Sequence, residues 1–154
     1  MIRVLITDDH PIVREGLKKI LSRESDIQVA GEAQNSEELM KLVQKEKWDI
    51  VVLDITMPGR GGLDVLKELS EKYPDLPVLI LSMHPEDQFA RRALQAGAAG
   101  YLTKDAAQEE LITAVRKILS GEKYISARLA EKLAASLRIS ADKPPHETLS
   151  DRES

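Results

Sequence analysis

The sequence predicts an α/β fold in which a five-stranded parallel sheet is covered by helices on both faces. Five short apolar segments alternate with segments whose apolar residues recur at helical spacing. In "IVVL", residues 50–53, the apolar residues are continuous, which is typical of a strand buried on both faces. Such an alternating series indicates parallel strands joined by right-handed crossovers, and therefore one doubly wound domain.

The predicted elements follow in order along the chain, and we interpret their apolar stripes as core packing. The helical segments lie between or after the strands. The helical spacing of their apolar residues is clearest at Leu39, Leu42 and Val43, at Leu63, Leu66 and Leu69, and at Leu111, Val115, Ile118 and Leu119. The five predicted strands are residues 2–7, 27–33, 49–54, 77–82 and 100–103.

A further helix is expected over residues 121–138, outside the alternating series. Its stripe has four-residue spacing, formed by Ile125, Leu129, Leu133 and Leu137. Two interpretations stay open, because a stripe does not choose its partner: the helix docks on its own domain, or it is a linker or dimerisation helix.

The last part of the chain has the composition of a linker followed by the start of a helix. Residues 139–148 are polar and contain a Pro pair, which is typical of a flexible linker. In "LSDRES", residues 149–154, Ser150 and Glu153 form a capping box. We expect residues 1–120 to form the main domain and the sequence to be the amino-terminal part of a longer protein.

Composition limits the classes of function. The chain has 154 residues, no cysteine and a formal charge of −4, so disulfide and thiolate chemistry is excluded and extensive contact with nucleic acid by this segment is disfavoured. It begins without a basic leader and has no apolar run long enough to cross a bilayer. We expect a cytoplasmic protein that meets DNA, if at all, through another part of the chain.

Polar residues follow the predicted strands where the apolar runs end. Because parallel strands share one carboxyl edge, these side chains should converge in one crevice. Each also has an ordinary explanation: Asp9 before Pro11 could cap a helix, Asp54 could cap a loop, Ser82 could cap the next helix, and Lys104 could be a solvated surface lysine. The residues concerned are Asp8, Asp9, Asp54, Ser82 and Lys104.

The electrostatics of this set point to a cation. Two carboxylates about 4 Å apart repel by roughly 4 kcal/mol at an effective dielectric constant near 20, so three require compensation. With no cysteine and no clustered histidine, oxygen ligands favour Mg²⁺, or Mn²⁺, over zinc. A cation, a lysine, a hydroxyl and a carboxylate nucleophile together suit transfer of a phosphoryl group onto Asp54.

Four motifs resemble the receiver domain of two-component response regulators: "DD" at residues 8–9, "LDITMP" at 53–58, "LS" at 81–82 and "YLTKD" at 101–105. The resemblance covers about residues 2–119 and implies a flavodoxin-like (βα)5 fold with strand order 2-1-3-4-5. The linker helix and "LSDRES" resemble the NarL/FixJ subfamily of transcription regulators, whose LuxR-type helix-turn-helix begins with a similar Leu-Ser/Thr-x-Arg-Glu pattern.

The resemblance implies a role for each matching residue. Asp54 would accept a phosphoryl group from a sensor histidine kinase, while Lys104 and Ser82 would contact the phosphoryl oxygens and Tyr101 would be a rotameric switch. The implied Mg²⁺ ligands are Asp8 through water, Asp9, Asp54 and the backbone carbonyl of Thr56. The positions of Thr56 and His84 would tune dephosphorylation.

The sequence departs from the common receiver pattern at Asp105, where many members have proline after the lysine. Because a cis peptide without proline costs several kcal/mol, the loop around Lys104 could differ from theirs. Tyr101 could instead be a half-buried strand aromatic with its hydroxyl in water.

Three functions are compatible with these residues. The leading one is a homodimer controlled by phosphorylation, whose missing carboxy-terminal domain binds DNA; it is not an enzyme that acts on a free substrate. Dimerisation could use the first and fifth helices, or the face formed by the fourth helix, the fifth strand and the fifth helix. A metal-dependent aspartyl phosphatase would normally have a second Asp where this chain has Thr56, and so lacks its proton shuttle. A third possibility is an interaction module that is never phosphorylated.

Overall fold

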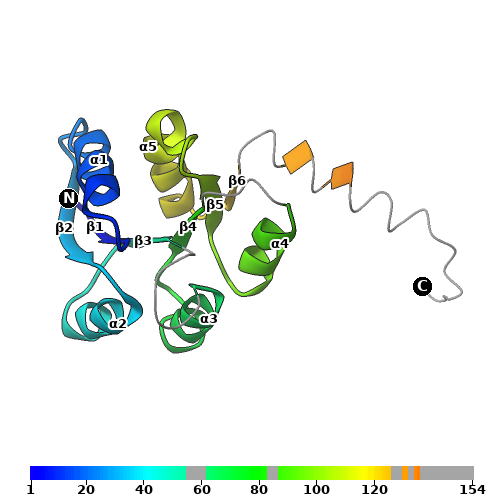
Figure 1. The fold of residues 1–154 in the computed structure, drawn as a ribbon, viewed down its shortest axis with the longest axis horizontal. Coiled ribbons are helices and arrows are strands. Elements are labelled where there is room, and N and C mark those ends of the chain that lie inside the picture. Colours follow the sequence, from blue (N-terminus) through cyan, green and yellow to red (C-terminus); the bar gives the residue numbers. More distant parts are fainter. Residues whose placement is uncertain (55–61, 83–86, 126–129, 132–133, 136–154) are drawn as a thin grey trace, which may run out of the picture.

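A parallel sheet of six strands forms the centre of the fold, in the order β2-β1-β3-β4-β5-β6 (Figure 1). The computed structural model describes residues 1–54, 62–82, 87–125, 130–131 and 134–135. The strands are β1 (Ile2–Thr7), β2 (Ile27–Ala33), β3 (Ile50–Asp54), β4 (Val78–Ser82), β5 (Gly100–Thr103) and β6 (Tyr124–Ile125), and the helices are α1 (Pro11–Leu21), α2 (Ser36–Lys45), α3 (Gly62–Lys72), α4 (Asp87–Gln95) and α5 (Ala107–Leu119).

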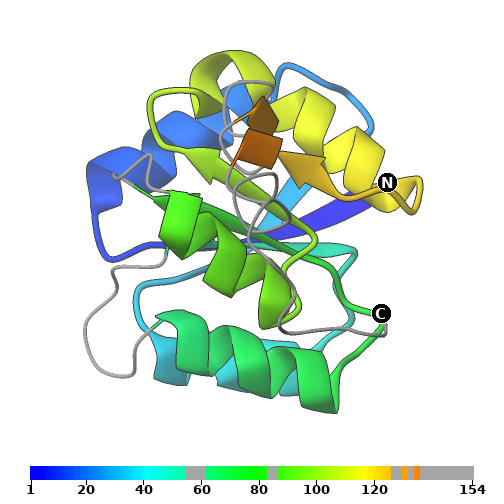
Figure 2. The same ribbon diagram turned by 90° about the vertical axis from the view of Figure 1, so that its right-hand side faces the viewer.

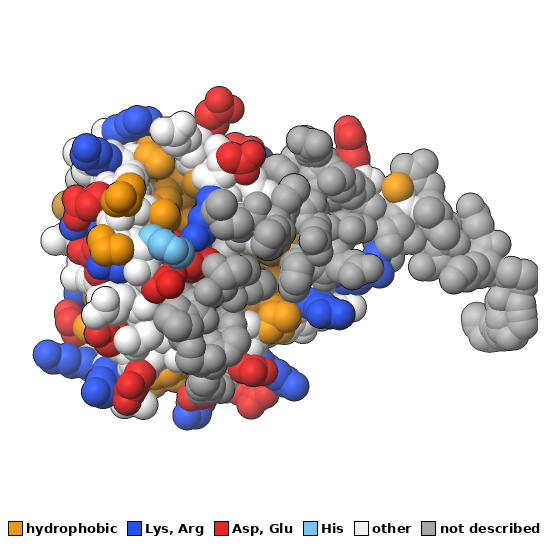
Figure 3. All heavy atoms as spheres, in the orientation of Figure 1, with side chains coloured by type: hydrophobic (Ala, Val, Ile, Leu, Met, Phe, Trp, Pro, Cys, Tyr) orange, Lys and Arg blue, Asp and Glu red, His pale blue; other side chains and the backbone are white. Residues whose placement is uncertain are grey.

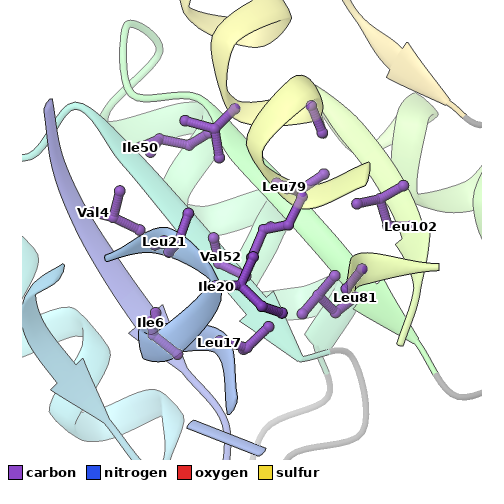
Figure 4. Close-up of a cluster of buried hydrophobic side chains, with 14 of the residues drawn as sticks. Val4, Ile6, Leu17, Ile20, Leu21, Ile50, Val52, Leu79, Leu81 and Leu102 are labelled. Carbon is purple, nitrogen blue, oxygen red and sulfur yellow. The ribbon is translucent and has the colours of Figure 1, made fainter. Parts of the chain in front are cut away.

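Helices cover both faces of the sheet. Figure 2 shows α1 and α5 on one side and α2, α3 and α4 on the other. The buried side chains divide accordingly, because successive residues of a strand point to opposite faces. Ile50 and Val52 pack with α1 and α5 in the cluster drawn in Figure 4, whereas Val51 and Leu53 pack with the other three helices. The predicted doubly wound fold and the order of its first five strands are confirmed.

The prediction of only five strands is wrong. The two-residue strand β6 pairs in parallel with β5, with Gly100 opposite Tyr124 and Tyr101 opposite Ile125. It comes after the turn at Gly121, whose φ of 99° lies in the left-handed region where glycine is favoured. The helix expected over residues 121–138 therefore does not begin before β6; residues 130–131 and 134–135 are helical, and the rest of that prediction lies outside the described residues.

The side chain of Tyr124 fixes β6 to α5. Its hydroxyl donates a 2.6 Å hydrogen bond to Glu110 Oε1. Burial, together with this carboxylate, raises the pKa of Tyr124 to about 12. The added strand thus has its own anchor on the helix that precedes it.

The start of α1 differs from the interpretation of Asp9 as a helix cap. The N-cap residue is His10, whose side chain makes no capping hydrogen bond, and Pro11 is the first helical residue. Proline suits this position because its φ is already helical and it has no N–H to satisfy. Asp9 is therefore left outside the helix, at the carboxyl edge of the sheet. Among the described residues, no helix is long and apolar enough to span a membrane.

Candidate functional site

The carboxyl ends of strands β1, β3 and β5, with β4 between the last two, bring the predicted residues together. Asp8 directly follows β1, Asp54 ends β3, and Lys104 directly follows β5. Lys104 Nζ lies 3.1 Å from Asp8 Oδ2 and 3.3 Å from Asp54 Oδ2. Both carboxylates are buried, and only 11% of the lysine side chain is exposed. The structure therefore joins three separated sequence motifs in one buried ion-pair cluster.

Ser82, the last residue of β4, is buried at the same edge. Its carbonyl oxygen accepts a 2.8 Å hydrogen bond from the backbone N–H of Lys104. This bond ties the turn that carries the lysine to the end of β4. Although Asp105 stands where many receivers have proline, the turn still directs the Lys104 side chain to Asp8 and Asp54.

The cluster has an excess of negative charge. Asp8, Asp9 and Asp54 carry three formal charges against the single ammonium of Lys104, with His10 neutral. Asp8 Oδ2 and Asp9 Oδ1 are buried atoms that make no hydrogen bond to any described residue, although Asp8 Oδ2 has the ion pair with Lys104. A buried carboxylate oxygen without a hydrogen bond is unfavourable unless a cation or a proton compensates its charge. Their oxygens are the ligand type that Mg²⁺ and Mn²⁺ prefer, so the residues fit a divalent cation.

The sequence interpretation missed one member of the cluster, the single histidine His10. One nitrogen of His10 and one oxygen each of Asp8, Asp9 and Asp54 lie within 4.8 Å of one another. His10 Nδ1 is 3.2 Å from Asp8 Oδ1 and 3.0 Å from Asp9 Oδ1. Figure 3 shows an exposed histidine beside acidic and basic side chains on this face. The only sequence signal was its place directly after the two aspartates.

A second group of charges holds the turn that carries Asp8. Arg14 Nη1 donates a 2.7 Å hydrogen bond to the carbonyl oxygen of Asp8, and Arg14 Nε donates a 3.1 Å bond to Glu32 Oε1. Lys18 also contacts Glu32 at 3.0 Å. The hydrogen bond from Lys18, with that from Arg14, lowers the pKa of Glu32. Helix α1 and strand β2 are thus connected through the backbone of an acidic site residue.

Tyr101 is fully buried in the core on the side of α2, α3 and α4. The interpretation of Tyr101 as a half-buried residue with its hydroxyl in water is therefore wrong. Thr56 and His84, expected to tune dephosphorylation, lie outside the described residues, as does the carbonyl of Thr56 expected to bind Mg²⁺.

The fold and the site together define an α/β protein with an acidic, lysine-containing cluster at the carboxyl edge of a parallel sheet. The family described as response regulator receiver domain matches residues 4–116, which is most of the chain, and the chain belongs to this family. The resemblance found in the sequence is therefore confirmed.

Known proteins of the same family agree with this assignment. The chain is 41% identical to the response regulator GacA of Pseudomonas aeruginosa, over 99% of this chain and 72% of that protein. A LuxR-family two-component response regulator from Aurantimonas sp. SI85-9A1 has a similar structure, with a TM-score of 0.84, 36% identity, and coverage of 88% of this chain and 97% of that one. RcsB from Salmonella enterica serovar Typhimurium, bound to a promoter in the presence of the phosphomimetic BeF3⁻, has a TM-score of 0.78 and 28% identity, covering 88% of this chain and 69% of that one. The protein is thus a response regulator of the two-component type.

Proposed function

We propose that Asp54 is the phosphoacceptor of this receiver and that a sensor histidine kinase supplies the phosphoryl group. The observation that carries the proposal is the buried Asp54 carboxylate, 3.3 Å from Lys104 Nζ at the edge of the sheet. A carboxylate oxygen attacks phosphorus, the bond from phosphorus to the donor's imidazole nitrogen breaks, and the imidazole leaves with the electron pair and takes a proton. The product is an acyl phosphate on Asp54.

Lys104 has a defined electrostatic part in this reaction. Before transfer its ammonium group partly compensates the negative charges of Asp8 and Asp54 through the two ion pairs. After transfer the same group can pair with phosphoryl oxygens, since the acyl phosphate carries its charge close to the former carboxylate. A cation held by Asp8, Asp9 and Asp54, and by the Thr56 carbonyl as the resemblance implies, supplies electrostatic stabilisation of the transferring phosphoryl group.

Phosphorylation then alters the neighbouring strands. Ser82 donates a hydrogen bond to the phosphoryl group, and Tyr101, on the adjacent strand β5, is the switch residue. The bond between the Lys104 N–H and the Ser82 carbonyl supports this coupling, because it links the lysine to the end of β4. In the complete protein the change controls homodimerisation and DNA binding, with Thr56 and His84 tuning the phosphoryl lifetime. We also retain the expected cytoplasmic location.

The proposal excludes turnover of a free phosphomonoester, because Thr56 has no carboxylate to act as proton shuttle. The protein would be phosphorylated once and hydrolyse that bond slowly, and so would not act as an enzyme on a separate substrate. Multiple-turnover hydrolysis of a phosphomonoester, measured by phosphate release, would support the phosphatase alternative instead.

The decisive experiment is intact-mass spectrometry after incubation with Mg²⁺ and acetyl phosphate. We expect one phosphoryl adduct on the wild-type protein, labile to hydroxylamine and missing in Asp54→Asn. An adduct of full yield on Asp54→Asn would refute the assignment of the acceptor, and a folded wild-type protein without an adduct would favour the interaction module. Lys104→Ala should separate phosphorylation from association: intact-mass spectrometry should show the adduct, while sedimentation velocity should show no change in oligomeric state.

A further inference from the structure

The imidazole of His10 has no part in the proposed phosphoryl transfer, yet it lies within the carboxylate cluster. We propose that His10 Nδ1 is a direct ligand of the divalent cation and makes this receiver favour d-block ions, such as Co²⁺ and Mn²⁺, over Mg²⁺ more strongly than an all-oxygen site would. This inference rests on the cation site of the proposed function.

The positions of the ligand atoms support direct binding. Two neighbouring ligands of an octahedral ion with bonds of about 2.1 Å lie about 3.0 Å apart. His10 Nδ1 lies 3.0 Å from Asp9 Oδ1 and 3.2 Å from Asp8 Oδ1. The nitrogen is therefore at the spacing of a ligand beside two carboxylate oxygens.

The contacts within the cluster engage one ligand atom and leave another without a hydrogen bond. His10 Nδ1 lies in hydrogen-bond geometry with Asp8 Oδ1 at 3.2 Å, so a cation bound to the nitrogen would take the place of the proton of that contact. The 3.0 Å contact between His10 and Asp9 lacks hydrogen-bond geometry, and Asp9 Oδ1 is a buried oxygen with no hydrogen bond to the described part of the chain. Asp8 Oδ2 is likewise buried and makes only the ion pair with Lys104.

The backbone brings His10 to this place independently of its ring. Its N–H donates a 2.8 Å hydrogen bond to Asp8 Oδ1, and its extended conformation, with φ −101° and ψ 113°, ends at the fixed start of α1. The side chain makes no capping bond to α1. The imidazole lies at the surface, since 61% of that side chain is exposed.

The chemistry of imidazole gives the direction of the preference. Mg²⁺ prefers hard oxygen ligands, whereas imidazole suits the later divalent ions, whose affinity for nitrogen rises from Mn²⁺ towards Cu²⁺. A site with one nitrogen and several carboxylates should still bind Mg²⁺, because the oxygens are sufficient for it. The histidine should therefore change the ratio of affinities much more than the affinity for Mg²⁺.

Calorimetric titration of the chain with Co²⁺ and with Mg²⁺ tests this inference, together with pulsed electron paramagnetic resonance of bound Mn²⁺. We expect His10→Ala to weaken Co²⁺ binding roughly tenfold, the lower end of the effect of perturbing a metal site, and Mg²⁺ binding less than about threefold. The wild-type Mn²⁺ complex should show the nitrogen coupling of a directly bonded imidazole, and His10→Ala should lose it.

Two variants separate ligation from other effects. His10→Gln can still donate a hydrogen bond to the carboxylates but has no imidazole, so it should behave like His10→Ala. His146→Ala removes another histidine of the chain and should leave every value unchanged. An unaltered ratio of Co²⁺ to Mg²⁺ affinity in His10→Ala, or no nitrogen coupling in the wild type, would overturn the inference.

The proposed function fails differently. If the wild type forms the Asp54 acyl phosphate with Mg²⁺ and His10→Ala leaves the affinity ratio unaltered, only the histidine ligand is refuted. If the folded wild type binds neither Co²⁺ nor Mg²⁺, the cation site itself is refuted, and with it the cation part of the proposed function.

Discussion

Replacing Asp54 by Asn should stabilise the protein in the absence of divalent cations. Asparagine keeps the shape of the side chain but removes one charge from a cluster of three carboxylates and one lysine, in which Asp8 and Asp54 are buried and Asp9 is partly exposed. The ligand atoms of Asp8, Asp9 and Asp54 lie within 4.8 Å of one another. Each carboxylate pair therefore repels by at least about 3.5 kcal/mol at an effective dielectric constant of 20.

The lost attraction is smaller than the relieved repulsion. With Lys104 Nζ 3.3 Å from Asp54 Oδ2, the same scale gives an attraction of about 5 kcal/mol. Asp54 takes part in two repulsive pairs, so removing its charge relieves about 7 kcal/mol. With His10 neutral, Asp54→Asn should therefore raise the free energy of unfolding by about 2 kcal/mol.

Urea unfolding followed by circular dichroism, once in EDTA and once in excess Mg²⁺, measures this effect. In EDTA the variant should have the higher midpoint at an unchanged slope. In Mg²⁺ the difference should shrink, because only the wild type retains the full ligand set and is stabilised by binding. Asp75→Asn, an exposed change of the same kind, should shift stability by less than about 0.5 kcal/mol. A variant less stable than wild type in EDTA would refute the electrostatic reasoning.

Three further predictions concern the supports of the sheet and of the site. Gly100→Ala should lower the free energy of unfolding by about 1–3 kcal/mol through overpacking, because its Cβ would lie 2.8 Å from the Tyr124 carbonyl oxygen. The control Gly16→Ala, in α1, places a Cβ that meets nothing within 4 Å and should raise the free energy of unfolding by about 0.5–1 kcal/mol. Chemical denaturation measures both changes. The pKa of Tyr124 is raised to about 12, so the stability that this shift contributes is complete below the unfolded pKa near 10 and is lost as pH rises towards 12. Tyr124→Phe should therefore lose less stability than the wild type over this pH range. Equal losses in the two proteins would contradict the prediction. The lowered pKa of Glu32 contributes stability that is present above its unfolded pKa and is lost as pH falls. Thermal melts of Glu32→Gln should therefore depend less on acid pH than those of the wild type. Because the variant also loosens Arg14, it should bind Mg²⁺ more weakly in calorimetry.

Most of the sheet could be predicted because its signal is local. Strands β1, β2 and β5 have the predicted bounds, and β3 and β4 each begin one residue later than predicted, at Ile50 and Val78. Continuous apolar runs that end in polar residues identify such strands directly. Their common edge also predicted which of the polar residues meet, as the ion pairs of Lys104 now show.

Strand β6 could not be predicted in this way. Two residues are too short for any periodicity, and their pairing depends on Gly100, more than twenty residues earlier, which has no side chain to push Tyr124 away. The place of His10 was missed for a related reason. Whether its ring turns towards Asp9 depends on the backbone at the start of α1, which Pro11 fixes, and residue spacing does not contain that information.

The charges of the site connect stability with signalling. The two-sided core has to hold Asp8 and Asp54 buried in spite of their repulsion, and Lys104 forms an ion pair with each of them. A bound cation would relieve that repulsion, and a phosphoryl group on Asp54, the proposed acceptor, would add negative charge and attract the lysine away from Asp8. Because the N–H of Lys104 is hydrogen-bonded to the Ser82 carbonyl, any movement of the lysine's turn acts directly on the end of β4. If Asp54 is the acceptor, the charge imbalance that lowers the stability of the cation-free protein would therefore also make the position of Lys104, and with it the end of β4, sensitive to phosphorylation.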